Sequence, residues 1–170
     1  MNKTKPPIYL FCDASLHPQS GIGFGAYLLL ENNELFGDNI KDTIKIKKFE
    51  NTSSTKLELE TLLWAFNEPS LQESHITVYT DCQNIITLNQ RRERFEQNNY
   101  KTRKGKEIKN HQLYKEFYRY IDTLECTFVK LKGHKKSSIK SEIDTLFTLV
   151  DRATRKSLRR NFFENLYCLQ

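Results

Sequence analysis

Two stretches of this sequence each have the pattern of a buried β-strand that ends in an aspartate. IYLFCD and ITVYTD each place five mostly apolar residues before an acid, and these acids are Asp13 and Asp81. A single aspartate at a strand end is commonly a turn or helix cap, but burying an unpaired carboxylate is costly. Two such acids on central strands are better explained by a shared cation. A carboxylate site without a Cys or His cluster favours Mg²⁺ or Mn²⁺ over zinc.

The remaining patterns predict an α/β fold built on one mixed sheet. Strands are expected at 8–15, 26–31 (after a turn containing Gly21, Gly23 and Gly25), 40–49, 75–82 and 126–133. Helices are expected at 55–66, where Ser53 or Ser54 caps the start, at 83–90, at about 112–125, and from about Ser141 onward. The order predicts a five-stranded mixed sheet, an antiparallel three-strand meander plus parallel strands, flanked by helices. No repeat or linker divides the chain, so residues 1–170 are expected to form a single domain.

The composition narrows the setting of the protein. A length of 170 residues with 38% hydrophobic content suits one folded domain rather than disorder. No run approaches the roughly 20 apolar residues of a membrane span, and the start lacks the pattern of a signal peptide. The four cysteines are scattered without a C-x-x-C pair. We therefore expect a cytoplasmic protein with reduced thiols and no membrane association.

Positive charge is concentrated in two places, and the net charge is +6. Residues 91–109 hold eight Lys/Arg against three Glu, and a second basic cluster follows Asp151. Such tracts suit a nucleic acid, although a solvated surface is the alternative. The phosphate contacts expected from the first tract are Arg91, Arg92, Arg103 and Lys104. Its Phe95 and Tyr100 either stack on bases or anchor the segment to the body.

Taken together, these segments resemble type 1 ribonuclease H. The matching stretches are YLFCDAS with GFGAYLL, SSTKLELETLLWA, VYTDCQNI, KLKGH and VDRATRKSLR, in the family's order from about residue 8 to about 160. The resemblance implies a ribonuclease H-like fold in which four acids hold two Mg²⁺ ions, with Mn²⁺ able to substitute. It also implies an endonuclease that hydrolyses the RNA strand of an RNA–DNA hybrid by a two-metal in-line mechanism and leaves 5′-phosphomonoesters.

The resemblance assigns roles to individual residues. The metal ligands are Asp13, Glu58, Asp81 and Asp151, and His134 resembles a histidine that assists proton transfer or product release. The substrate-binding positions are Ala14, Ser15, Ser54, Thr55 and Gln83. Glu60 lies about 200° around its helix from Glu58, so it is expected to be solvent-exposed. Ala14 replaces a frequent glycine and Ser54-Thr55 replaces a frequent Asn-Asn, which is expected to alter contacts to the RNA 2′-hydroxyl groups.

The fourth acid is the ambiguous one. The usual spacing after His134 leads to Asp144, whereas the surrounding sequence, VDRATRK, favours Asp151. Both acids flank one apolar stripe of the same helix, about 10 Å apart along its axis. Only one can reach a pair of metal ions about 4 Å apart. We predict that Asp151 is the ligand and that Asp144 is a capping acid in the first helical turn.

Other functions stay open at this point. A catalytically weak or inactive nucleic-acid-binding module of the same fold would need to lose a metal acid, and all four are present. A related DNA-junction nuclease would cut all-DNA substrates, and a domain of a reverse transcriptase is a third alternative. We expect an RNA–DNA hybrid as the partner, no obligate protein partner and a monomer. The apolar tail 161–170 is expected to pack onto the core or to contact a partner.

Overall fold

The protein forms one mixed five-stranded sheet, which confirms the predicted fold class. The structure, a computed structural model, describes residues 7–31, 39–132 and 141–167. The strands are β1 (Pro7–His17), β2 (Ile22–Glu31), β3 (Lys45–Phe49), β4 (His75–Thr80) and β5 (Glu125–Lys130). Their order in the sheet is β3-β2-β1-β4-β5. The pairs β1–β2 and β2–β3 are antiparallel, whereas β1–β4 and β4–β5 are parallel.

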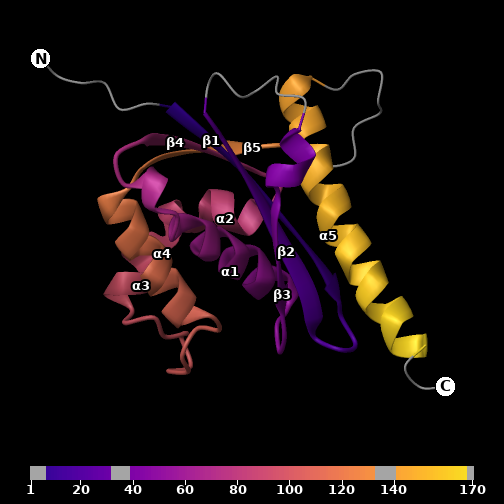
Figure 1. Ribbon diagram of the computed structural model, residues 1–170. Coiled ribbons are helices and arrows are strands. Elements are labelled where there is room, and N and C mark those ends of the chain that lie inside the picture. Colours follow the sequence, from indigo (N-terminus) through magenta and orange to yellow (C-terminus); the bar gives the residue numbers. More distant parts are fainter. Residues whose placement is uncertain (1–6, 32–38, 133–140, 168–170) are drawn as a thin grey trace, which may run out of the picture.

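Helices cover both faces of this sheet (Figure 1). They are α1 (Ser54–Phe66), α2 (Gln83–Leu88), α3 (Arg92–Gln97), α4 (His111–Thr123) and α5 (Glu142–Tyr167), with 3₁₀ turns at Ile40–Thr43, Pro69–Leu71 and Asn89–Arg91. One core lies under α1 and α4 and includes Leu59, Phe66 and Phe117. The other lies between the sheet and α5, where Phe11 packs in the same cluster as Phe147. Within the described ranges, no helix combines the length and apolarity that crossing a membrane requires.

Two sequence predictions about β2 and β3 are wrong in their bounds. Residues 40–43 form a 3₁₀ turn, so β3 occupies only the second half of the predicted strand 40–49. Among the three glycines assigned to a turn, only Gly21 takes the left-handed conformation, with φ of +65°. Gly23 and Gly25 lie within β2, which therefore begins four residues earlier than predicted.

The reason for these strand glycines is the close approach of α1. A Cβ added at Gly25 would lie 2.0 Å from Thr61 Oγ1, and one at Gly23 would lie 2.3 Å from Leu57 Cδ2. Real atoms repel one another strongly at such distances. Because protein interiors are densely packed, the neighbouring atoms have little room to move aside. Glycine at these positions therefore lets α1 lie directly against the backbone of β2. This contact fixes the position of the helix that carries Glu58.

The basic tract, residues 91–109, forms α3 and a following loop that aromatic residues anchor to the body. Phe95 and Tyr100 are buried, and the ring of Phe95 stacks on that of Tyr114 with centroids 5.4 Å apart. Tyr100 has a φ of 55°, and its backbone N–H donates to the carbonyl of Phe95 at 2.7 Å, which closes the end of α3. Of the two roles open for Phe95 and Tyr100, the structure supports the anchor.

The glycine contact generates a test of helix position. Gly25→Ala should lower the free energy of unfolding by about 1–3 kcal/mol, the usual cost of overpacking, because the new methyl group meets Thr61. The measurement is urea unfolding of the variant. In a Thr61→Ala background the same substitution should cost clearly less, because the two nearest side-chain atoms are then gone. An equal cost in both backgrounds would show that α1 and β2 do not meet as described.

Candidate active site

Three acids that are far apart in the sequence meet beside the adjacent strands β1 and β4. Asp13 lies in β1, Glu58 in α1, and Asp81 directly follows β4. Each offers a carboxylate oxygen within 4.8 Å of those of the other two. Asp13 and Asp81 both lie two residues beyond the paired positions Phe11 and Tyr79 on parallel neighbouring strands, so they reach the same level of the sheet. The chain thereby gathers three negative groups in one small volume.

Burial and repulsion raise the pKa values of two of these carboxylates, Asp13 and Glu58. Asp13 is only 6% exposed, and burial, then the charges of Asp81 and Asp151, raise its pKa from 3.8 to about 7. The backbone N–H of Ala14 and the hydroxyl of Thr154 oppose this rise. Burial, followed by the charges of Asp13 and Asp81, also raises the pKa of Glu58 well above its usual value. Like charges at such a site are costly unless a cation neutralises them.

The donor set fits a hard divalent cation. Glu58 Oε2 is buried and has no hydrogen-bond partner among the described residues. An unsatisfied buried carboxylate oxygen costs free energy, and a bound ion is one way in which a native structure satisfies it. The three neighbouring groups offer only oxygen ligands, which suit Mg²⁺ or Mn²⁺. In both chemistry and geometry, these residues could hold a metal ion.

The two aspartates of α5 have different surroundings. Asp144 is buried and accepts hydrogen bonds from the backbone N–H and the hydroxyl of Ser141, at 3.0 and 2.9 Å. Its own N–H donates to Ser141 Oγ at 3.2 Å, which completes a reciprocal cap at the start of the helix. Asp151 lies near enough to Asp13 to raise its pKa, and it forms an ion pair with Arg155 at 2.7 Å. The capping role expected for Asp144 is therefore present, and Asp151 as fourth metal ligand stays a prediction.

Comparison with known proteins shows the family. A family model described as RNase H matches residues 5–152. The chain belongs to the RNase H family. A Ribonuclease H from Caldicellulosiruptor saccharolyticus is 31% identical over 102 residues, which cover 57% of this chain and 68% of that protein. Family and fold together support ribonuclease H activity, and RNase H enzymes generally use divalent metal ions, which agrees with the acid cluster.

Solved structures share the RNase H fold at low sequence identity. The solution structure of a PFV RNase H domain is 15% identical, with a TM-score of 0.64, and the match covers 89% of this chain and 93% of that one. LC9-RNase H1, described as a type 1 RNase H with the type 2 active-site motif, is 16% identical with a TM-score of 0.65. That match covers 92% of this chain and 75% of the other. These likenesses concern the fold alone.

One residue of this RNase H site escaped the sequence analysis. Thr154 is fully buried, and its hydroxyl lies 3.4 Å from Asp13 Oδ2 and 2.8 Å from the carbonyl oxygen of Asp151. It bridges α5 to β1 beside the acids and favours the ionised form of Asp13. The only sequence signal was a polar residue one turn after Asp151. By contrast, Ala153 and Leu158, two apolar residues of the same helix, are only half-buried.

Glu60 was expected to be solvent-exposed, and this prediction is wrong. Its side chain is 21% exposed, accepts a hydrogen bond from Thr52 Oγ1 at 2.9 Å and pairs with Lys56 at 3.5 Å. It belongs to none of the acids that could share a metal ion among the described residues. Glu60 therefore stabilises the start of α1, and Glu58 alone on this helix joins the cluster.

The predicted substrate positions surround the cluster unequally. Ala14 and Ser15 are half-buried in β1, directly after Asp13, while Ser54 and Thr55 are exposed in the first turn of α1. Gln83 is exposed at the start of α2 and accepts a hydrogen bond from the ammonium group of Lys130. The structure does not test their contacts with a substrate. His134 lies outside the described residues.

The basic tract contains cations of two kinds. Arg91 donates to the carbonyl of Asn84 at 2.8 Å, and Arg92 forms two hydrogen bonds to the carboxylate of Asp122. These two arginines therefore secure α2 and α3 to the body, which lowers their availability for phosphate. Arg103 and Lys104 are exposed in the loop beyond α3. They are the better placed of the four predicted phosphate contacts.

The raised pKa of Asp13 predicts a dependence of stability on pH. The folded state keeps a proton that the unfolded chain loses, so the free energy of unfolding should fall as pH rises from about 4 to about 7. Without divalent ions, Asp13→Asn should remove the part of this loss that Asp13 causes and be more stable than wild type at pH 8 by up to about 4 kcal/mol. Urea unfolding between pH 4 and 8, with chelator, measures the effect.

A matched control is Asp42→Asn, since Asp42 is exposed in a 3₁₀ turn. This variant should follow the wild-type curve at every pH. If Asp13→Asn also follows it, the acid cluster carries no electrostatic strain.

Proposed function

We propose that this protein is a divalent-metal-dependent endoribonuclease that hydrolyses the RNA strand of RNA–DNA hybrids. The observation that carries the proposal is the convergence of Asp13, Glu58 and Asp81 within 4.8 Å, with a buried, partnerless oxygen on Glu58. The fold adds support. A foamy viral protease-reverse transcriptase solved in complex with RNA/DNA hybrid matches with a TM-score of 0.58 at 12% identity, covering 89% of this chain and 20% of that one. That title describes the viral protein, and the hybrid enters here as a proposal.

In this proposal the four acids Asp13, Glu58, Asp81 and Asp151 hold two divalent ions at the scissile phosphate. When bound, such ions supply an activated water and stabilise the leaving 3′-oxygen in an in-line displacement that leaves a 5′-phosphate. Thr154 and the N–H of Ala14 oppose the rise in the pKa of Asp13 and so favour its ionised form. The contact of α1 with β2 holds Glu58 in place, and the ion pair with Arg155 orients Asp151. His134 as an aid to proton transfer or product release stays a prediction.

Substrate recognition would use the residues around this cluster. Ser15, Ser54 and Thr55 carry hydroxyl groups suited to the 2′-hydroxyls that distinguish RNA from DNA. Arg103 and Lys104 would bind phosphates of the DNA strand. Cys12, Cys82 and Cys126 are free thiols, which is compatible with the proposed cytoplasmic location. We also propose that the protein is a monomer.

The activity is tested with matched duplexes of one sequence. Labelled RNA–DNA hybrid, double-stranded RNA and double-stranded DNA are incubated with the protein in Mg²⁺, in Mn²⁺ and in chelator. We expect cleavage of the RNA strand of the hybrid with either metal and none with chelator, because carboxylates alone cannot neutralise the phosphate. Equal cleavage of double-stranded DNA would favour the junction-nuclease alternative. Hybrid binding without cleavage in any metal would favour an inactive binding module.

The identity of the fourth ligand follows from two amide substitutions. Asp151→Asn deletes a charge beside Asp13, so turnover at saturating hybrid should fall roughly a hundredfold or more. This loss is at least as large as the one that follows when a residue hydrogen-bonded to a metal ligand is replaced. Part of the loss should return at high Mn²⁺. Asp144→Asn should lower stability by about 1 kcal/mol, the scale of a helix cap, and leave turnover nearly intact. The measurements are turnover at saturating hybrid and urea unfolding, which separate chemistry from stability.

Asp144→Asn serves as the matched control, because both substitutions remove one carboxylate from the same helix. If Asp144→Asn abolishes turnover and Asp151→Asn does not, the spacing from His134 was the correct guide.

A further inference from the structure

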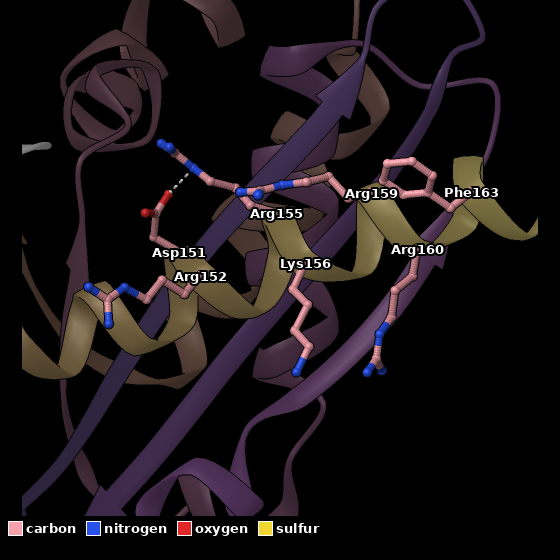
Figure 2. A pocket seen from close by; sticks show the side chains of 7 residues that line it. All are labelled: Asp151, Arg152, Arg155, Lys156, Arg159, Arg160 and Phe163. Carbon is pink, nitrogen blue, oxygen red and sulfur yellow. Dashed lines mark ion pairs between the residues drawn. The ribbon is translucent and has the colours of Figure 1, made fainter.

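The second half of α5 carries a basic groove that begins at the acid cluster. Seven side chains line this groove, whose volume is about 610 Å³, and we call it the α5 groove (Figure 2). They are Asp151, Arg152, Arg155, Lys156, Arg159, Arg160 and Phe163. At one end is Asp151, whose charge acts on Asp13. The groove is therefore continuous with the proposed centre of cleavage.

Most of the positive charge in the α5 groove is unneutralised. Arg155 pairs with Asp151 at 2.7 Å. The other four cations, Arg152, Lys156, Arg159 and Arg160, have no ion-pair partner in the part of the chain that the structure describes. They lie in two neighbouring rows spaced by four residues, one of Arg152, Lys156 and Arg160 and the other of Arg155 and Arg159 (Figure 2). Like charges at this spacing repel, and a polyanion would relieve the repulsion.

An exposed aromatic ring closes the far end of the groove. Phe163 continues the row of Arg155 and Arg159 and is 61% exposed, one of two exposed large apolar side chains among the described residues. Its neighbour Phe162 behaves differently, since its ring packs on His17 with centroids 4.3 Å apart. The contact of Phe162 secures the helix against the β1–β2 turn. Phe162 thus packs onto the end of β1, whereas Phe163 is exposed among the described residues and can contact a ligand.

The combination of cations and a free ring favours an unpaired strand over a duplex. Cations bind phosphates of either, but a duplex hides the faces of its bases, and only an unpaired base can stack on Phe163. From Asp151 to Phe163 the helix rises about 18 Å. That length matches about five nucleotides of stacked strand at roughly 3.4 Å each.

We propose that the α5 groove binds a single-stranded extension of the RNA strand of a hybrid, with phosphates on the arginine and lysine rows and a base on Phe163. This inference rests on the proposed function, because the RNA strand is the one assigned to the acid cluster where the groove begins. It deepens that function by defining the substrate as a hybrid with a single-stranded tail. The protein would then hold junctions between hybrid and single strand more tightly than blunt hybrids.

Binding is measured first, without cleavage. Fluorescence anisotropy with a labelled eight-nucleotide single-stranded RNA is recorded in chelator over a range of salt concentrations. Arg159→Gln/Arg160→Gln should weaken binding and make the salt dependence shallower by about 1.4 log units, because each phosphate contact on a single strand contributes about 0.7. Phe163→Ala should weaken binding roughly fivefold or more through lost stacking and leave the salt dependence unchanged.

The matched control removes two exposed cations from the other face of the sheet, Lys115→Gln/Arg119→Gln on α4. It should bind the RNA as wild type does. If the control weakens binding as much as the groove variants, or if Phe163→Ala binds like wild type, the groove is a solvated surface and the inference fails. Circular dichroism confirms that each variant is folded.

Cleavage then assigns the strand. Three hybrids of one sequence are compared in Mg²⁺, blunt, with a single-stranded RNA tail, and with a DNA tail. We expect wild type and the control to bind and cut the RNA-tailed hybrid more efficiently than the blunt one, and both groove variants to lose this advantage. An advantage confined to the DNA tail would overturn the assignment to RNA. If no hybrid is cut while RNA binding still depends on the groove, the proposed function has failed and the binding site stands alone.

Discussion

Mutual repulsion among three closely spaced carboxylates, one buried and two half-buried, is the constraint on which the rest of this structure depends. Asp13, Glu58 and Asp81 come within 4.8 Å of one another, and burial adds to the cost of their charges. A cluster of this kind forms only if the surrounding fold is rigid enough to hold it against that repulsion. Two parallel strands fix the two aspartates at one level of the sheet. A bound divalent cation would release this strain.

The two faces of the sheet contribute to the site by different contacts. On one face, Gly23 and Gly25 let α1 rest against β2, which brings Glu58 to the aspartates. On the other, α5 packs through Phe147 and Val150, and its Thr154 reaches Asp13. Beyond the cluster, side chains of the same helix line the basic α5 groove. The acids proposed for catalysis and the residues proposed to contact the substrate thus lie on elements whose packing is set by the core.

The sequence alone predicted those features of the fold and the site that follow from local residue patterns. The strand-end pattern singled out Asp13 and Asp81, and the series of elements led to the mixed sheet. Family resemblance was needed for Glu58, because nothing local distinguishes it from Glu60 two residues later. The strand glycines, Thr154 and the intramolecular roles of Arg91 and Arg92 were missed. The glycines, Thr154 and Arg92 depend on partners far away in sequence, such as Asp122 for Arg92, and therefore on tertiary packing that no local pattern reveals.

The most direct test of a metal site at these acids is the anomalous diffraction of a protein crystal soaked in Mn²⁺. The account predicts anomalous peaks bounded by Asp13, Glu58 and Asp81, with the otherwise partnerless Glu58 Oε2 as one of the ligands. A crystal of Glu58→Gln soaked in the same way should show weaker or missing peaks. Strong Mn²⁺ sites elsewhere on the protein, with none among these three acids, would contradict the account.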